Sequence, residues 1–276
     1  MKLALCNEVL KHLPFEEQCR LAAAIGCSGL ELSPFTLADD PSTLTEADAR
    51  RLRGVAADHG LAISSLHWLL VKPVGLSIST ADAALHARTV AFLSRMIGFA
   101  AACSAPVLVH GSPAQRSPAP GQSVADALGR SVAAWAALAA VAERHGVVYC
   151  IEPLSRAETP VINTVAEAAA VVDQIGSPAV RTMLDLSAAS QAESVAPAEV
   201  LARHLASGHI AHVQMNDRNR RGPGQGDTPV APVLRVLHGA GYRGWVVLEP
   251  FEYLPEPLAC AAASAAYVRG IWEAIT

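Results

Sequence analysis

The hydrophobic positions of the chain form one pattern that recurs eight times. A short apolar run of four to six residues ends in polar residues, and a longer stretch rich in alanine and leucine, with helical spacing, follows it. Several of the short runs are apolar without alternation, as in strands that are covered on both faces. We predict strands at residues 3–6, 29–33, 63–68, 107–111, 148–153, 182–186, 211–216 and 245–250.

Eight strand–helix units in succession predict parallel strands joined by right-handed crossovers. We therefore expect the α/β class, with residues 1–276 forming a single (β/α)8 TIM barrel domain. An open doubly wound sheet is the alternative, although no GxGxxG motif follows the first strand. The least regular segments each follow a strand, which in a barrel places them on the face where active sites form: residues 34–42, 70–80, 112–122 and 217–228.

The amino-acid composition argues against some classes of binding partner. Hydrophobic residues make up 51% of the chain, charged residues make up 17%, and the formal net charge is −4, so we expect no nucleic-acid partner. The six cysteines are scattered and form no CxxC pair, which argues against a disulfide framework and favours a reducing, cytoplasmic location. We expect no signal peptide and no membrane partner, because charged residues interrupt the alanine-rich stretches.

Polar residues that suit a metal site end the last four predicted strands. Glu152 and Asp185 end strands five and six, Gln214 lies near the end of strand seven, and Glu249 ends strand eight. Each alone is as readily a solvated carboxylate or a helix cap, but buried carboxylates that converge need a compensating cation. Three carboxylates and an amide carbonyl form a hard oxygen set. They predict one divalent ion, Mn or Mg first and Co or Zn next.

The histidines at the strand ends have less specific interpretations. His67 and His110 end strands three and four, where each either binds a ligand or forms a hydrogen bond in the barrel mouth. His212 is expected to pack or to form a hydrogen bond within strand seven. The glycine-rich segment 222–226 after Arg220 is either a turn or part of a site for a hydroxyl-rich ligand.

These residues lie in motifs that resemble the xylose-isomerase-like barrel superfamily, the group of sugar isomerases and epimerases. The resemblance covers nearly the whole chain and is strongest from Ile151 to Thr159 and from His212 to Gly226. Leu248-Glu249-Pro250, Gly29-Leu30-Glu31, and the segments 66–70 and 110–116 add to it. Together the motifs are specific for the superfamily but not for a substrate.

The resemblance implies roles for individual residues. Ketose 3-epimerases of this group bind one metal through Glu, Asp, His and Glu, which match Glu152, Asp185, Gln214 and Glu249; glutamine at the third position is similar to the hydroxypyruvate-isomerase-like branch. The two glutamates would be the catalytic acid/base pair. Glu158, Arg220, His67 and His110 would bind the substrate, and relatives of this kind suggest a homodimer or homotetramer. One departure is Ala188, where the family usually has a histidine.

We therefore expect a metal-dependent isomerase or epimerase that acts on a sugar or a sugar-derived keto acid. Its mechanism would be proton transfer next to a carbonyl through a metal-stabilised enediolate. A dehydratase of a carbocyclic or keto-acid substrate on the same scaffold is the alternative. An apurinic-site endonuclease would need further histidines, including one at Ala188, and a surface for DNA. The non-enzyme alternative is a binding barrel that has lost activity.

Overall fold

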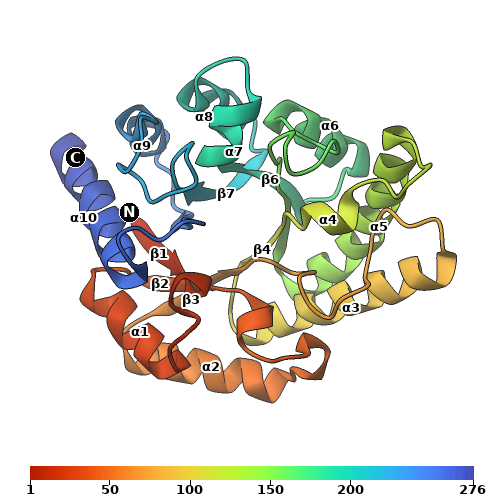
Figure 1. Ribbon diagram of the computed structural model, residues 1–276, viewed down its shortest axis with the longest axis horizontal. Coiled ribbons are helices and arrows are strands. Elements are labelled where there is room, and N and C mark those ends of the chain that lie inside the picture. Colours follow the sequence, from red (N-terminus) through yellow and green to blue (C-terminus); the bar gives the residue numbers. More distant parts are fainter.

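The strands of the computed structural model, which describes residues 1–276, close into a barrel. Each strand pairs in parallel with its neighbours in the sequence, and β8 pairs with β1 (Figure 1). All eight predicted strands are present and the predicted TIM barrel is confirmed. The strands are β1 (Lys2–Cys6), β2 (Gly29–Leu32), β3 (Ala62–Leu66), β4 (Val107–His110), β5 (Val148–Ile151), β6 (Val180–Asp185), β7 (Ile210–Met215) and β8 (Trp245–Leu248).

Helices surround the barrel, one or more after each strand, with short 3-10 turns coming first after β1 and β2 (Figure 1). The long helices are α1 (Phe15–Ala24), α2 (Glu46–Asp58), α3 (Ala83–Ala102), α5 (Val124–His145), α6 (Val165–Ile175), α8 (Pro197–Ala206), α9 (Val230–Gly239) and α10 (Pro257–Ile275). The short elements, all in loops that follow strands, are η1 (Asn7–Leu10), η2 (Pro34–Thr36), η3 (Pro41–Thr43), α4 (Pro113–Arg116) and α7 (Leu186–Ala192).

Successive strand residues face alternately into the barrel and outward toward the helices. In β4, Leu108 belongs to the large cluster between the strands and the helices, whereas Val107 and Val109 pack inside the barrel with Cys150 and Met183. This alternation decides which polar residues reach the interior. The pairing shifts by one residue between β2 and β3 and between β6 and β7, as in β-bulges beside functional sites.

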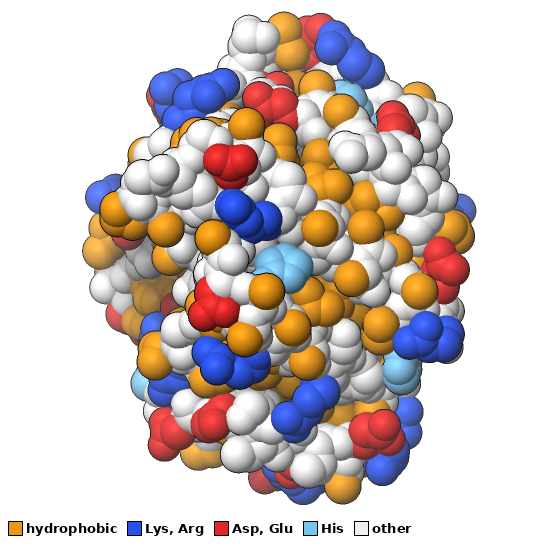
Figure 2. Space-filling view, turned by 90° about the vertical axis from the view of Figure 1, so that its right-hand side faces the viewer, with side chains coloured by type: hydrophobic (Ala, Val, Ile, Leu, Met, Phe, Trp, Pro, Cys, Tyr) orange, Lys and Arg blue, Asp and Glu red, His pale blue; other side chains and the backbone are white.

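Helix α5 is the one helix that is long and apolar enough to cross a membrane, judged by length and composition alone. Its buried side chains include Trp135 and Leu138, which pack in the cluster between the strands and the helices. Figure 2 shows the side of the molecule that carries α3 and α5, where hydrophobic side chains spread over the middle of the face and charged ones lie among and around them. The packing of α5 is that of a barrel helix.

Candidate active site

Four oxygen-bearing side chains point into the barrel at the C-terminal ends of β5 to β8. Glu152 and Glu249 directly follow β5 and β8, Asp185 ends β6, and Gln214 lies one residue before the end of β7. All four are buried. The structure thus brings the predicted set to one place, and the role of its members as metal ligands remains a prediction.

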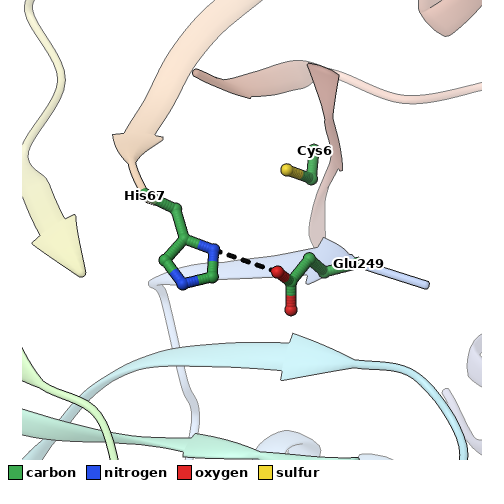
Figure 3. A group of neighbouring side chains, drawn as sticks. All are labelled: Cys6, His67 and Glu249. Atoms are coloured by element: carbon green, nitrogen blue, oxygen red, sulfur yellow. Dashed lines mark ion pairs between the residues drawn. The ribbon is translucent and has the colours of Figure 1, made fainter. Parts of the chain in front are cut away.

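His67, which directly follows β3, lies between the two glutamates. Its Nε2 is 3.1 Å from Glu152 Oε2, and its Nδ1 is 3.0 Å from Glu249 Oε1. The Nε2 atom of Gln214 is 3.0 Å from the same Nδ1. Figure 3 shows the ring of His67 directed at the Glu249 carboxylate. His67, expected to bind substrate, therefore forms part of the acidic group itself.

Asp185 is fixed by two hydrogen bonds. Asn216 Nδ2 donates to its Oδ2 at 2.6 Å, and the backbone N–H of Ala188 donates to its Oδ1 at 2.7 Å. The second bond makes Asp185 the N-cap of α7. The same Asn216 nitrogen lies 3.2 Å from the backbone oxygen of Glu249, which links the ends of β6 and β8. Ala188 is buried and contributes only its backbone, so the site lacks the side-chain donor of a histidine there.

Burial and mutual repulsion disfavour the charged forms of the carboxylates in the acidic group, and His67 offsets this only in part. Burial raises the pKa of Asp185 to about 7, and the charge of Glu152 adds to the effect. Burial also raises the pKa of Glu249 well above its ordinary value, although His67 opposes this. Burial disfavours a charged His67, but Glu249 and Glu152 outweigh it and raise the His67 pKa well above its ordinary value. A bound cation would stabilise all of these carboxylates in their charged form.

Two buried oxygen atoms in this group have no hydrogen-bond partner. They are Gln214 Oε1 and Glu249 Oε2. A buried polar atom left unpaired costs about 1–3 kcal/mol, so such atoms are usually satisfied by a ligand, water or ion. Together with carboxylates of Glu152 and Asp185 they offer the oxygen donors that a hard divalent cation takes. The residues present therefore fit a divalent metal.

Cys6, Glu249 and His67 form a second group whose ligand atoms all lie within 4.8 Å of one another (Figure 3). Cys6 ends β1 and was not singled out in the sequence. Burial raises the pKa of its thiol to about 12, although a hydrogen bond with His67 opposes the shift. Because a thiolate is the form that binds metal, the oxygen set is the better fit.

Aromatic side chains cover the acidic group. Trp68 Nε1 donates to Glu249 Oε1 at 3.1 Å, and the indole meets the rings of Phe35 and Phe251 edge to face. Trp68 and Phe251 line one pocket with Glu152. These walls give the pocket an apolar surface beside the carboxylates.

The backbone after β4 comes unusually close to Glu152. A Cβ on Gly111 would collide with Glu152 Oε2, so any other residue there would force the Glu152 carboxylate to move. The next residue, Ser112, has a left-handed backbone with φ of 45°, its Oγ is buried without a partner, and it lines the same pocket. A strained residue with an unpaired hydroxyl in a pocket is a candidate substrate contact.

Glu158 and Arg220 lie at the rim of this pocket. Arg220 Nη1 is 3.3 Å from Glu158 Oε1, and its guanidinium lies 4.3 Å from the centre of the Phe251 ring. Glu158 also lines the pocket, and its other oxygen accepts from the backbone and hydroxyl of Ser155. The two predicted substrate-binding residues are therefore adjacent, and both side chains are partly exposed to solvent.

Comparison with known proteins decides the family. The family model described as a xylose isomerase-like TIM barrel matches residues 19–270. The chain belongs to this family. A D-psicose 3-epimerase of Ruminiclostridium cellulolyticum is 34% identical over 122 residues, which cover 44% of this chain but only 41% of that protein.

Two further relatives of this xylose isomerase-like barrel match over more of their length. An L-ribulose 3-epimerase of Mesorhizobium japonicum is 28% identical over 89% of this chain and 79% of its own. A solved structure of D-psicose 3-epimerase in the presence of D-fructose superposes with a TM-score of 0.83, at 22% identity, over 99% of both chains. That similarity supports the fold.

In this xylose isomerase-like barrel, His110 does not join the acidic group. Its Nδ1 lies 2.6 Å from the hydroxyl of Tyr149 and accepts from Trp135 Nε1 at 3.2 Å. Both partners belong to the layer between the strands and the helices. Burial lowers the pKa of His110 to about 3, so the ring is neutral. His110 thus forms its hydrogen bonds on the side of β4 that faces the helices, and its expected substrate contact remains a prediction.

Glu31 is the main residue of the interior that the sequence pattern left without a role. It is fully buried on β2 and accepts from Ser65 Oγ at 2.7 Å, His212 Nε2 at 3.0 Å and Gln214 Nε2 at 2.8 Å. Burial opposes its charge, but His212 and His67 lower its pKa to about 2. The alternation of residues along β2 could have identified it. Leu30 and Leu32 face the helices, so Glu31 between them faces the interior of the barrel.

Proposed function

We propose that this protein is a metal-dependent isomerase or epimerase of a sugar or a sugar-derived keto acid. The observation that carries the proposal is the position of Glu152 and Glu249, which approach the two nitrogens of one buried imidazole from different strands, beside two unpaired oxygen atoms. The relatives named as D-psicose 3-epimerase and L-ribulose 3-epimerase support the same class of reaction.

In the proposed mechanism, one glutamate removes a proton from a carbon next to a carbonyl and the other returns one. Glu152 and Glu249 stand three strands apart around the barrel, so they reach a substrate between them from different sides. Return to the same carbon from the opposite face gives epimerisation, and return to the neighbouring carbon gives isomerisation. Acid–base catalysis of this kind contributes about 10²–10⁴-fold.

A divalent ion held by Glu152, Asp185, Gln214 and Glu249, with Mn or Mg as the first candidates, would stabilise negative charge on the substrate's oxygens. The side chains around the pocket would position the substrate. Ser112 Oγ and the Glu158–Arg220 pair offer hydrogen bonds to hydroxyl groups, while the indole of Trp68 provides an apolar wall and excludes water from the carboxylates.

Exchange with solvent deuterium tests the reaction class. The purified protein, loaded with Mn²⁺, is incubated in D₂O with ketoses, hydroxypyruvate, inososes and keto acids, and deuterium next to the carbonyl is measured by NMR. We expect incorporation that falls at least ~100-fold in Glu152→Gln and Glu249→Gln but is unchanged in Glu252→Gln, an exposed glutamate of the loop after β8.

Each other outcome favours another function. A conjugated carbonyl that absorbs in the ultraviolet, formed from an inosose or a keto acid, would identify a dehydratase. A protein that holds no divalent ion by elemental analysis and exchanges no proton on any of these compounds would be a binding barrel. If both glutamine variants keep full turnover on an active substrate, the proposed acid/base roles are wrong.

A further inference from the structure

Gln214 is the one predicted ligand whose two ends differ chemically. Its carbonyl oxygen can bind a cation, whereas its amide nitrogen carries two hydrogens and repels one. The shape of the side chain itself does not favour one end, because rotation by about 180° exchanges oxygen and nitrogen at almost no change in shape. Some neighbour must therefore determine which end faces the site.

Two atoms lie near the nitrogen end of this amide, and His67 Nδ1, at 3.0 Å, can donate or accept according to its protonation. Glu31 is the neighbour that decides. Its Oε1 lies 2.8 Å from Gln214 Nε2, and an ionised carboxylate only accepts hydrogen bonds. The nitrogen of Gln214 must therefore face Glu31, which leaves Gln214 Oε1 buried and unpaired on the other side. We propose that Glu31 is a positioning residue that holds the amide of Gln214 with its oxygen toward the divalent-cation site.

Glu31 is itself held firmly in place. Ser65 Oγ and His212 Nε2 both bond its Oε2, at 2.7 and 3.0 Å, so Oε1 remains for Gln214. The pairing shift between Leu30 and Glu31 sets Glu31 opposite Ser65. The two oxygens thus have separate tasks: one anchors the carboxylate and the other orients the amide.

A competing role for Glu31 is that of a counter-charge. His67 Nδ1 lies 3.7 Å from Glu31 Oε1 and His212 is bonded to Oε2, so a carboxylate here also balances charge. Loss of that charge would lower stability or cation affinity by the same amount whatever residue stands at position 214. The positioning role depends on it entirely, and this difference can be measured.

The inference rests on the proposed metal site, and metal binding is the direct readout. Metal-free wild type, Glu31→Gln and Ser65→Ala are titrated with Mn²⁺ by calorimetry, and their Co²⁺ complexes are recorded by visible absorption. Loss of an orienting partner typically costs about 10–100-fold in metal affinity, so we expect that loss and a changed Co²⁺ spectrum in Glu31→Gln. Ser65→Ala, which retains the carboxylate, should bind within about threefold of wild type.

The double variant that exchanges the two side chains, Glu31→Gln with Gln214→Glu, is the sharper test. It keeps the net charge of the site and reverses the hydrogen bond. The amide, now on β2, donates to the carboxylate, now on β7, and the second carboxylate oxygen faces the cation. We expect its Mn²⁺ affinity to return to within about tenfold of wild type. If Glu31→Gln does not fold, the double variant is compared with wild type alone, and a loss beyond about 100-fold overturns the proposal.

A double-mutant comparison separates positioning from counter-charge. In a Gln214→Ala background no amide remains to orient, so we expect Glu31→Gln to change the affinity less than about threefold. An equal loss in both backgrounds, or an exchanged pair that binds no tighter than Glu31→Gln, overturns the positioning role. Wild type that binds neither Mn²⁺ nor Co²⁺ instead refutes the metal site of the proposed function, which is a distinct result.

Discussion

The indole of Trp68 and the imidazole of His67 share one oxygen of Glu249. Trp68 Nε1 donates to Oε1 at 3.1 Å, His67 Nδ1 lies 3.0 Å from the same atom, and Oε2 has no partner. This arrangement fixes the plane of the carboxylate and leaves its second oxygen for a cation or a substrate proton. The backbone of Trp68 adopts φ of 56°, a left-handed conformation that costs a non-glycine residue about 1–2 kcal/mol.

Replacing Trp68 with phenylalanine should therefore impair catalysis while preserving an aromatic ring. A hydrogen bond to a charged group contributes about 1.5–3 kcal/mol, so we expect kcat/KM to fall roughly 10- to 100-fold on an identified substrate. Trp272→Phe, on α10 away from the site, is the matched control and should keep wild-type kinetics. Unchanged kcat/KM in Trp68→Phe would show that this bond does not orient a catalytic carboxylate.

Metal binding should stabilise the fold. At a Mn²⁺ concentration about one hundred times its Kd, linkage adds about 2.7 kcal/mol, or roughly 5–10 °C in Tm for a chain of this size. We expect a chelator to abolish the gain, Asp185→Asn to reduce it by more than half, and Asp39→Asn, an exposed aspartate paired with Lys72, to leave it unchanged. Calorimetric scans of wild type, Asp185→Asn and Asp39→Asn, each with and without Mn²⁺, measure the rise in Tm. An equal shift in wild type and Asp185→Asn would remove Asp185 from the ligand set.

The barrel and the convergence of its strand-end carboxylates could be predicted because both follow from local patterns. Apolar runs locate the strands, and parallel strands place their C-terminal ends on one face, so Glu152 and Glu249 had to lie near each other. A residue's position at the end of a strand does not determine whether its side chain faces the interior of the barrel or the helices. Glu31 faces inward and His110 faces the helices, although both come from strands of this barrel.

The alternation of inward and outward residues along each strand would have distinguished Glu31 from His110. His110 lies two residues after Leu108, a residue of the outer cluster, whereas Glu31 lies between the outward-facing Leu30 and Leu32. The other features depend on atoms far apart in the sequence. The bond from Trp68 to Glu249 and the close approach of Gly111 to Glu152 join separate loops. Neither contact can be predicted from the pattern of residues in one segment alone.

The outward position of His110 predicts that its replacement affects stability more than binding. His110→Leu leaves the buried Trp135 Nε1 and Tyr149 hydroxyl without their partner, at about 1–3 kcal/mol for each unsatisfied group. We expect the free energy of unfolding, measured with urea, to fall by about 2–4 kcal/mol. KM of the folded protein should stay within about twofold of wild type. A tenfold rise in KM at unchanged stability would instead support the predicted substrate contact.

Substitutions of Ser112 should affect substrate binding and stability independently. Both Ser112→Ala and Ser112→Gly remove the unpaired hydroxyl that lines the pocket. If that hydroxyl bonds the substrate, each variant loses about 0.5–1.5 kcal/mol of binding, which raises KM roughly 2- to 10-fold.

The two variants should differ in stability, because only glycine relieves the left-handed backbone at φ of 45°. We expect Ser112→Gly to be more stable than Ser112→Ala by about 1 kcal/mol in urea unfolding, while their KM values rise equally. A rise in KM for alanine alone would mean that backbone strain, and not the hydroxyl, governs substrate binding at this position. Unchanged KM in both variants would remove Ser112 from the substrate site.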